Sequence, residues 1–306
     1  MTRSFLSVSD ISQQELGAIL RMARDIKAKI KGRKKMNSLH DKAVGLLFEK
    51  PSTRTRISFE VATVRLGGHP VYLASSELQL SRGEPIKDTA RILGGYLDAI
   101  VARVYSHDSV VQLSKHSNIP VINALSDLEH PTQIVSDLFT IWEVKKKLKG
   151  ITLAYVGDGN NVCNSLLLGA ATSGMNMVAS CPDGYHPNPT ILQRARDLSN
   201  KTGAIIKVVE RPRDAVRGAD ILYTDVWVSM GQEAEKDKKI AAFSGYQINS
   251  DLLKIAAKGA VVMHCLPAHR EMEITEDVIE GNQSIVWQQG ENKLYGAAAV
   301  LDFFLR

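Results

Sequence analysis

The sequence predicts an α/β protein of two doubly wound domains, each a central parallel sheet flanked by helices, joined by long interdomain helices. Strand-like apolar runs alternate with helical runs from residue 43 onward, as is typical of parallel sheets. The 306 residues exceed what one compact core usually fills, which favours two domains. A long helix with one apolar face, predicted over 131–149, falls between two series of strands and can bridge them.

The first series of strands follows an amphipathic opening helix predicted over 9–31. Its strands are predicted near 43–48, 70–74, 99–104 and 120–123. Further helices are expected to begin near Ser52, near Pro85, a residue type that suits the first helical turn, and near His107.

The second series of strands is predicted near 151–156, 177–180, 204–209, 220–224 and 260–265. The interval 229–249 is long, polar and charged, and we interpret it as a lid or binding loop. A last apolar helix, predicted over 293–306, is expected to pack back on the first domain. The predicted domains are therefore 1–149, joined by the helix 293–306, and 150–292.

Composition describes an ordinary globular protein, with 44% hydrophobic and 23% charged residues. The net charge of +5 comes largely from two basic helix surfaces, 27–35 and 145–147, without interleaved aromatic residues, so nucleic-acid binding is not expected. Cys163, Cys181 and Cys265 are too few and too scattered for a disulfide framework and favour a reducing cytoplasm. Membrane residence is not expected, because no apolar run approaches the roughly 20 residues of a span.

The segment 52–56, Ser-Thr-Arg-Thr-Arg, combines hydroxyl and guanidinium groups where a strand turns into a helix. Backbone N–H groups at a helix start have no partner within the helix and, with the helix dipole, favour a phosphate. Arg54 and Arg56 can add charge and fork geometry. The segment therefore predicts an anion site, although an N-cap followed by solvated arginines also fits this stretch taken alone.

Other reactive side chains follow predicted strands, and parallel sheets bind ligands outside the carboxyl ends of their strands. Arg103 lies at the end of the third strand, and the segment 130–133, His-Pro-Thr-Gln, follows the fourth after a short loop. In the second half, Asp225 follows one strand and the segment 264–267, His-Cys-Leu-Pro, closes the last. Each alone is a weak signal, but together they predict binding sites in both halves.

Together these residues resemble the aspartate/ornithine carbamoyltransferase family, and within it the ornithine enzymes. The carbamoyl phosphate loop of the family appears here as 52–56, its second phosphate and carbonyl motif as 130–133, and its single arginine as Arg103. Two segments that separate ornithine enzymes from aspartate enzymes are 225–231 and 264–267. The match runs in order from end to end, so the joint signal is far more specific than any one motif.

The resemblance implies carbamoyl transfer from carbamoyl phosphate to L-ornithine, giving L-citrulline and phosphate in arginine metabolism, with no cofactor and no metal. The amine attacks the carbamoyl carbon, and negative charge develops on the old carbonyl oxygen, toward which Thr55, Arg103 and His130 are aimed. Gln133 orients the carbamoyl NH2. The implied catalytic residues are Arg103, His130 and Cys265. The implied carbamoyl phosphate ligands are Ser52, Thr53, Arg54, Thr55, Gln79, Arg103, His130, Pro131, Thr132, Gln133, Cys265, Leu266 and Lys293.

The implied ornithine ligands are Asn161, Asp225, Ser229 and Met230. Asp225 carries the charge that pairs with the α-ammonium, and Asn161, which follows Asn160, can bond both the α-amine and the α-carboxylate. Cys265 is expected to face the δ-amine. The proton of that amine goes either to a Cys265 thiolate or to the leaving phosphate.

One position departs from the family pattern. Before the last helix the family usually has Glu-Asn-Arg, and this chain has Glu291-Asn292-Lys293. Lysine keeps the charge but loses the planar fork, which puts a bidentate contact with carbamoyl phosphate in question. The alternative is a lysine at the helix start that faces solvent.

Three other interpretations are weaker. The segment 157–159, Gly-Asp-Gly, suggests a nicotinamide-dependent oxidoreductase, but Val162 stands where that fingerprint needs a glycine. His264, Cys265 and His269 lack the spacing of a closed zinc site. A noncatalytic member of the fold is disfavoured because, apart from the arginine-to-lysine change, the charged groups that the reaction needs are present.

Within the enzyme class, putrescine and N-acylated ornithine stay open as alternative substrates. Aspartate calls for a cationic lining where this chain has Asp225, and putrescine leaves Asp225 and Asn161 without an α-amino acid to hold. The resemblance also implies a homo-oligomer, a trimer or a multiple of trimers, in which the loop of Gln79 completes the site of a neighbouring chain. Arginine synthesis and arginine breakdown use the same residues.

Overall fold

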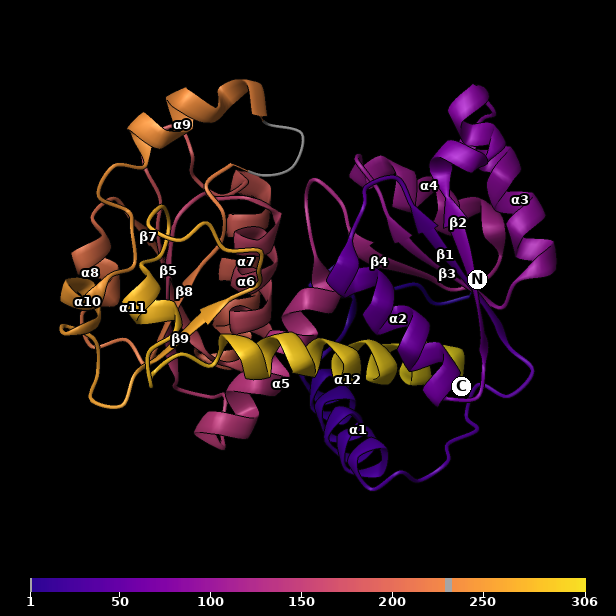
Figure 1. Cartoon of the computed structure of the whole chain (residues 1–306), viewed down its shortest axis with the longest axis horizontal. Helices are drawn as coiled ribbons and strands as arrows, with labels where there is room; N and C mark the ends of the chain where they lie inside the picture. The colour runs from indigo at the N-terminus through magenta and orange to yellow at the C-terminus, as the bar shows by residue number, and fades with distance from the viewer. Residues whose placement is uncertain (1, 229–232) are drawn as a thin grey trace. The chain divides into compact units, whose positions relative to one another are not determined.

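A computed structural model describes residues 2–228 and 233–306 of the chain (Figure 1). The chain divides into two compact units, Met1–Phe139 with Glu291–Arg306, and Thr140–Gly290. Helices α5 (Pro131–Lys145) and α12 (Val286–Leu305) each contribute residues to both units. The predicted α/β class with two helix-flanked parallel sheets is confirmed, whereas the domain boundaries after residue 149 and before residue 293 stay a prediction.

The first unit contains a parallel sheet with the strand order β2-β1-β3-β4. Its strands are β1 (Ala43–Phe48), β2 (His69–Ala74), β3 (Ala99–Arg103) and β4 (Val121–Leu125). Helices α3 (Ile86–Tyr96) and α4 (His107–Ser117) pack together on one side of this sheet, and α2 (Thr53–Arg65) lies on the other (Figure 1). The opening helix α1 (Gln13–Lys31) contacts α5 and α12 through Lys27. Three-residue and four-residue 3-10 turns are η1 (Val8–Asp10), η2 (Ser75–Glu77) and η3 (Gln79–Arg82).

The second unit contains a parallel sheet with the strand order β7-β6-β5-β8-β9. Its strands are β5 (Thr152–Val156), β6 (Asn176–Ser180), β7 (Ile206–Val209), β8 (Ile221–Thr224) and β9 (Val261–His264). Helices α6 (Asn161–Ser173) and α7 (Pro189–Thr202) lie side by side on one side of the sheet (Figure 1). The helices on the other side are α8 (Pro212–Val216), α10 (Ser250–Leu253) and α11 (Glu276–Ile279), which share one hydrophobic core (Figure 1). The 3-10 turn η4 (Glu233–Glu235) and α9 (Lys236–Ala242) follow β8.

Both sheets contain a point where the chain reverses its direction of travel across the sheet. These points lie between β1 and β3 in the first unit and between β5 and β8 in the second. Ligands of open α/β sheets bind outside the carboxyl ends of such strands, because the connections there leave on opposite sides. We therefore expect ligand-binding or catalytic groups in the segments after β1 and β5 and at Arg103 and Asp225.

Local sequence explains where several elements begin and end. Strand β8 is an apolar run that is buried throughout, as expected inside a parallel sheet. Helix α1 begins at Gln13 because Ser12 and Glu15 cap its first turn reciprocally. Helix α6 ends where Gly174 adopts a φ of 78°, a left-handed conformation that glycine takes without strain.

The structure confirms all nine predicted strands, with ends shifted by no more than two residues. Three helix boundaries differ. The opening helix starts at Gln13 instead of residue 9, because residues 8–10 form a separately capped turn. Helix α5 ends at Lys145 instead of residue 149, where Lys146 has a φ of 62°. Helix α12 starts at Val286 instead of Lys293, since its interior tolerates Gly290 despite the low helix propensity of glycine.

The interval 229–249, interpreted as a lid or binding loop, contains the helix α9. Its residues 229–232 lie outside the described part of the chain. The lid role stays a prediction.

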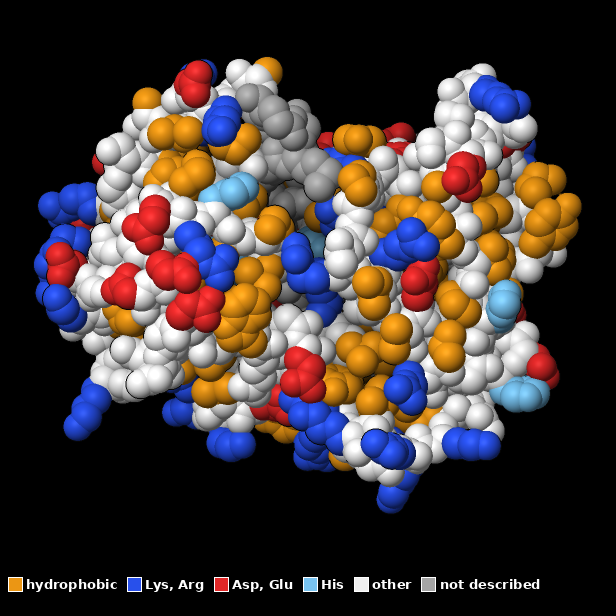
Figure 2. Space-filling model, in the orientation of Figure 1, with side chains coloured by type: hydrophobic (Ala, Val, Ile, Leu, Met, Phe, Trp, Pro, Cys, Tyr) orange, Lys and Arg blue, Asp and Glu red, His pale blue; other side chains and the backbone are white. Residues whose placement is uncertain are grey.

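The protein surface carries acidic and basic side chains that are interspersed on the face drawn in Figure 2. In the first unit, large apolar side chains that are exposed include Ile57, Val64, Ile92 and Tyr96. Across residues 2–228 and 233–306, no helix combines the length and apolar character that crossing a membrane requires.

Candidate active site

The helix start after β1 forms as the sequence predicts. Ser52 is the N-cap of α2, and its Oγ accepts a hydrogen bond from the Thr55 N–H at 3.3 Å. Thr55 is buried, Arg54 is half-buried and Thr53 is exposed. Helix α2 thus begins beside the carboxyl end of β1 with hydroxyl and guanidinium groups on its first turn, which is the chemistry of an anion site.

Arg56 is engaged away from this helix start. Its Nε donates to Oε1 of Glu60 at 2.9 Å, and its guanidinium carbon lies 3.6 Å from the centroid of the Tyr72 ring. The pair with Glu60, four residues along the helix, and the contact with the ring both stabilise this position. Against the expectation from sequence, the charge of Arg56 therefore belongs to Glu60 and Tyr72, and Arg54 is left as the arginine for the anion.

Lys293 and Gln133, both predicted carbamoyl phosphate ligands, are in direct contact in the first unit. The Lys293 Nζ donates to Oε1 of Gln133 at 2.6 Å, and Nε2 of Gln133 donates to Oδ1 of Asp137 at 2.9 Å. Helix α12 begins at Val286, so Lys293 lies past the first turn of the helix and not at its start. Its side chain is only 6% exposed. The alternative of a solvent-facing lysine is wrong, and the buried ammonium fixes the orientation of the Gln133 amide.

His130 precedes α5 and is buried in the same part of the unit. Burial lowers the pKa of His130 well below its ordinary value of 6.5, and the positive charges of Lys293 and Arg103 lower it further. The imidazole is therefore neutral at neutral pH, and a neutral imidazole can donate one N–H to an oxyanion. Arg103 and Lys293 supply the positive potential around it.

Lys50, in the connection from β1 to α2, is a cation that the sequence analysis did not single out. Burial lowers the pKa of Lys50, and the nearby charge of Arg103 lowers it further. Its ammonium lies 4.4 Å from the centroid of the Tyr105 ring. The only sequence signal for it is its place two residues before Ser52, between the strand and the anion motif.

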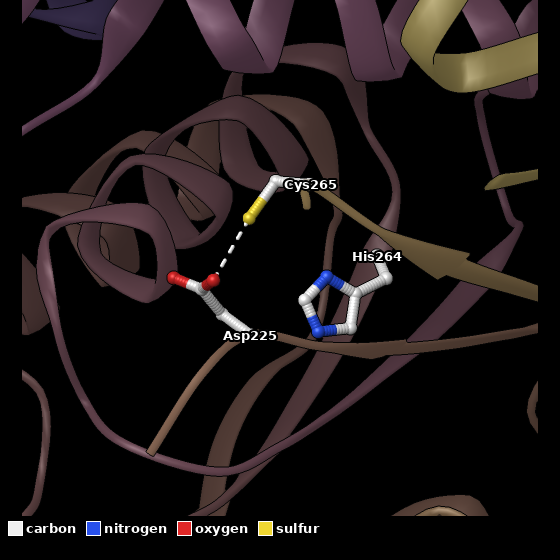
Figure 3. A group of neighbouring side chains, drawn as sticks. All are labelled: Asp225, His264 and Cys265. Atoms are coloured by element: carbon white, nitrogen blue, oxygen red, sulfur yellow. Dashed lines mark hydrogen bonds between the residues drawn. The ribbon is translucent and has the colours of Figure 1, made fainter. Parts of the chain in front are cut away.

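Asp225 follows β8 in the second unit, and its carboxylate accepts three hydrogen bonds from residues that the structure describes. Oδ1 accepts from the Val226 N–H at 2.8 Å and from Sγ of Cys265 at 3.0 Å, and Oδ2 accepts from Nδ2 of Asn160 at 2.8 Å. Figure 3 shows the Cys265 thiol directed at the carboxylate, with the His264 ring beside them. Asp225 is 6% exposed, so a fixed negative charge is held in a largely buried place next to a thiol.

Asn160 is the N-cap of α6, and its side-chain amide binds both the first turn of α6 and the carboxylate of Asp225. Its Oδ1 accepts from the N–H groups of Val162 and Cys163 at 3.0 and 3.1 Å, while its Nδ2 bonds Asp225. Its amide is therefore committed to the cap and to the carboxylate. Asn161, the predicted ornithine ligand, is the first residue of α6 and is half-buried.

His264 orders the segment that carries Cys265. Its Nδ1 accepts from the Leu266 N–H at 2.9 Å, so the ring proton belongs on Nε2, which lies 3.2 Å from Oε1 of the fully buried Glu273. The backbone N–H of His264 donates to Gln289 at 2.9 Å. Since the Leu266 N–H is used by His264, Leu266 can offer carbamoyl phosphate only its carbonyl oxygen.

The ligand atoms of Asp225, His264 and Cys265 lie within 4.8 Å of one another. A metal ion there would have to displace either the Leu266 N–H from Nδ1 of His264 or Glu273 from Nε2. The absence of a metal stays a prediction.

Comparison with known proteins assigns both halves of the chain. Residues 3–143 match the family model described as the aspartate/ornithine carbamoyltransferase carbamoyl-P binding domain, and residues 149–304 match the Asp/Orn binding domain of the same family. The chain belongs to the aspartate/ornithine carbamoyltransferase family. The resemblance expected from the sequence motifs is confirmed.

Relatives within the carbamoyltransferase family align along nearly the whole chain. The ornithine carbamoyltransferase of Methanosarcina acetivorans is 49% identical over 301 residues, which cover 98% of this chain and 98% of the relative. The solved ornithine carbamoyltransferase of Pyrococcus furiosus has a TM-score of 0.95 at 46% identity and covers 98% of this chain and 96% of its own. An anabolic ornithine carbamoyltransferase from Campylobacter jejuni has a TM-score of 0.93 at 39% identity, covering 99% of both chains.

The predicted carbamoyltransferase residues fall into two groups, one in each unit. In the first unit, Pro131 and Thr132 open α5 next to His130 and are buried. Gln79 begins the exposed turn η3, and within the described residues its side chain has no hydrogen bond to either group. Ser229 and Met230 lie outside the described residues.

Proposed function

We propose that the protein transfers the carbamoyl group of carbamoyl phosphate to the δ-amine of L-ornithine, forming L-citrulline and phosphate. One observation carries the choice of ornithine: the buried carboxylate of Asp225 accepts the thiol of Cys265 at 3.0 Å. A carboxylate can pair with an α-ammonium, while the adjacent thiol can contact a second amine. L-Aspartate, with its two carboxylates, is disfavoured by this charge.

Residues 1–149 with 293–306 hold carbamoyl phosphate in this proposal. The first turn of α2, with Ser52, Thr53, Arg54 and Thr55, binds the phosphoryl oxygens through N–H groups, hydroxyls and the arginine. Arg103 and the neutral imidazole of His130 donate to the carbonyl oxygen, where negative charge develops. Gln133, oriented by Lys293, accepts from the carbamoyl NH2 through the remaining lone pair of its oxygen.

Residues 150–292 hold L-ornithine, with Asp225, Asn161, Ser229 and Met230 at its α-amino acid end. The neutral δ-nitrogen forms a bond to the carbamoyl carbon, the bond from that carbon to the phosphate oxygen breaks, and phosphate leaves with the electron pair. The attacking nitrogen also loses a proton. Because the thiol of Cys265 already donates its hydrogen to Asp225, the departing phosphate is the acceptor that needs no rearrangement.

The reaction involves no oxidation or reduction, so the protein needs no redox cofactor. Most of the rate enhancement then comes from positioning and electrostatic stabilisation.

Product analysis tests this function. Purified protein is incubated with carbamoyl phosphate and one of four amines, L-ornithine, L-aspartate, putrescine or N-acetyl-L-ornithine, and carbamoylated product and phosphate are both measured. We expect equal amounts of citrulline and phosphate with ornithine, and turnover of the other amines lower by about 100-fold or more. Equal or faster turnover of another amine would show that the assigned substrate is wrong.

We also propose a cytoplasmic homotrimer that serves arginine biosynthesis. None of the three cysteines, all of which the structure describes, forms a disulfide, which suits a reducing compartment. The first unit exposes groups that can contact other copies of the chain. These are the turn that begins at Gln79 and the apolar side chains of Ile57, Val64, Ile92 and Tyr96. The solved relative from Campylobacter jejuni is described as anabolic.

Sedimentation analysis tests the trimer. Mixing the variants Gln79→Ala and Arg103→Ala tests whether a neighbouring chain shares the site, because mixed trimers then regain part of the lost activity. A monomer in solution, or mixtures without any regained activity, would contradict the shared site.

A further inference from the structure

Lys239 of α9 is a buried lysine with a buried partner. Its Nζ donates to Oδ2 of Asp158 at 2.5 Å, and the side chains of Lys239 and Asp158 are 2% and 9% exposed. Removing two charges from water costs free energy that the attraction between them offsets only when the geometry is good. Neither the candidate site nor the comparisons give this pair a role, although it connects α9, a helix within the predicted lid interval 229–249, to the loop before Asn160.

The surroundings of Lys239 hold α9 in one position. The Nζ lies 5.5 Å from the centroid of the Tyr185 ring. Phe243, just after α9, packs against Tyr185 at 5.0 Å between ring centroids and against Trp227 at 5.7 Å. Trp227 is two residues after Asp225. The contact of Phe243 with Trp227 therefore connects the end of α9 to the segment that carries the Asp225 carboxylate.

Asp158 lies in a loop that has little freedom to move independently. Its carbonyl oxygen accepts from the hydroxyl of Tyr155 at 2.8 Å, and the N–H of Gly159 donates to the Tyr185 carbonyl at 2.9 Å. A Cβ on Gly159 would lie 2.3 Å from the backbone of His186, so the loop is pressed against that segment. Displacing Asp158 therefore displaces Asn160, whose Nδ2 bonds Asp225.

The charges near the pair favour a lysine at this place. Burial raises the pKa of Asp158, and the charges of Asp225 and Glu235 act in the same direction, while Lys239 opposes all three. Without the ammonium, the buried Asp158 would either take up a proton or turn toward water. Both responses change the loop that presents Asn160 and Asn161.

We propose that Lys239 is a positioning residue: through its bond to Asp158 it holds the loop 157–161 against Asp225 and so sets the affinity for the α-amino acid end of the second substrate. This inference rests on the proposed function. It predicts that the loss of Lys239 weakens binding of the amino acid while carbamoyl phosphate binding is unchanged, because every residue assigned to the phosphate end lies in the other unit apart from Cys265 and Leu266.

Four full-length proteins test the inference: wild type, Lys239→Met, the double variant Asp158→Asn with Lys239→Met, and Lys238→Met as the matched control. Lys238 is the neighbouring lysine of α9 and is exposed. For each we measure KM and kcat for L-ornithine, the thermal midpoint, and Kd for carbamoyl phosphate. We also measure Kd for L-norvaline with carbamoyl phosphate bound, since norvaline has the same α-amino acid head without the δ-amine.

For Lys239→Met we expect the ornithine KM and the norvaline Kd to rise about tenfold or more, with carbamoyl phosphate Kd within about twofold of wild type. The double variant has no unpaired buried charge and recovers thermal stability, but both constants stay raised because a neutral pair does not restore the loop. Lys238→Met stays within about twofold in every constant. If Lys239→Met does not fold, the double variant alone decides.

The inference is overturned if a folded Lys239 variant binds ornithine and norvaline like wild type, or if binding recovers in step with thermal stability in the double variant. A purely structural pair gives that second outcome. If wild type itself forms no citrulline, the proposed function fails and the inference fails with it. Normal wild-type turnover with unaffected variants removes the inference alone.

Discussion

Replacing Asn160 separates the two tasks of its amide. In Asn160→Ser the hydroxyl can still cap α6, but the shorter side chain cannot reach Oδ2 of Asp225, which loses the hydrogen bond from Nδ2 of Asn160. A hydrogen bond to a charged group contributes about 1.5–3 kcal/mol, and about 1.4 kcal/mol corresponds to tenfold in affinity. We therefore expect the ornithine KM to rise roughly tenfold to 100-fold, and the free energy of unfolding to fall by about 1.5–3 kcal/mol, because the bond is present without ligand.

Initial rates of citrulline formation with ornithine varied, at saturating carbamoyl phosphate, measure this effect, and urea unfolding measures stability. Asn160→Ala loses the cap as well, so it should unfold about 1 kcal/mol more easily than Asn160→Ser. Asn249→Ala is the matched control, because Asn249 caps α10 through the Leu252 N–H in the same unit and has no contact with Asp225. An ornithine KM within twofold of wild type in Asn160→Ser, or an equal rise in Asn249→Ala, would refute the reasoning.

Three further predictions concern the first unit. As pH falls below 6.5, the ordinary histidine pKa, His130 binds a proton in the unfolded chain but not in the folded protein, where burial lowers its pKa. The free energy of unfolding should therefore drop by up to about 1.4 kcal/mol per pH unit. The variant His130→Asn should lack this part of the pH dependence, and equal slopes for both proteins in urea unfolding would contradict the prediction. Lys293→Met removes a positive charge beside His130 and the hydrogen bond that the ammonium donates to the Gln133 oxygen. The pKa of His130, measured by NMR titration, should rise, and the Kd for carbamoyl phosphate, measured by calorimetry, should increase about tenfold to 100-fold. An unchanged Kd would exclude a role of Lys293 at the phosphate. Arg54→Ala should weaken carbamoyl phosphate by a similar factor, whereas Arg56→Ala should leave its Kd within about twofold, and the reverse order would restore Arg56 to the anion site.

The sequence predicts the fold well because the strands of a parallel sheet are buried on both faces and therefore have a clear apolar sequence pattern. Its strands are continuous apolar runs, and each run here is separated from the next by at least one helix. Helices α2, α4, α6 and α7 begin at a Ser or Asn cap that the sequence shows. The predicted site also depends on this regularity, since Arg103 and Asp225 were found from their places at strand ends. Residue type and position along the chain are enough for such positions.

The roles that the sequence did not reveal depend on contacts between distant segments. Lys239 stands in a charged run, 233–239, that looks like a solvated surface, yet it is buried because Asp158, 81 residues earlier, lies opposite. Arg56 belongs to the anion motif but meets Tyr72 on a neighbouring strand. Asn160 and Asn161 have the same side chain, and only the structure shows that the Asn160 amide caps α6 and bonds Asp225.

The unequal burial of the three cysteines makes the protein suitable for selective chemical labelling. Cys163 and Cys181 are fully buried, and burial raises the pKa of the Cys163 thiol well above its ordinary value, whereas Cys265 is partly open to solvent. A mild alkylating reagent should therefore form one adduct first, at Cys265. The mass of the intact chain then reports, molecule by molecule, whether a ligand shields that sulfur, without any coupled assay or engineered tag.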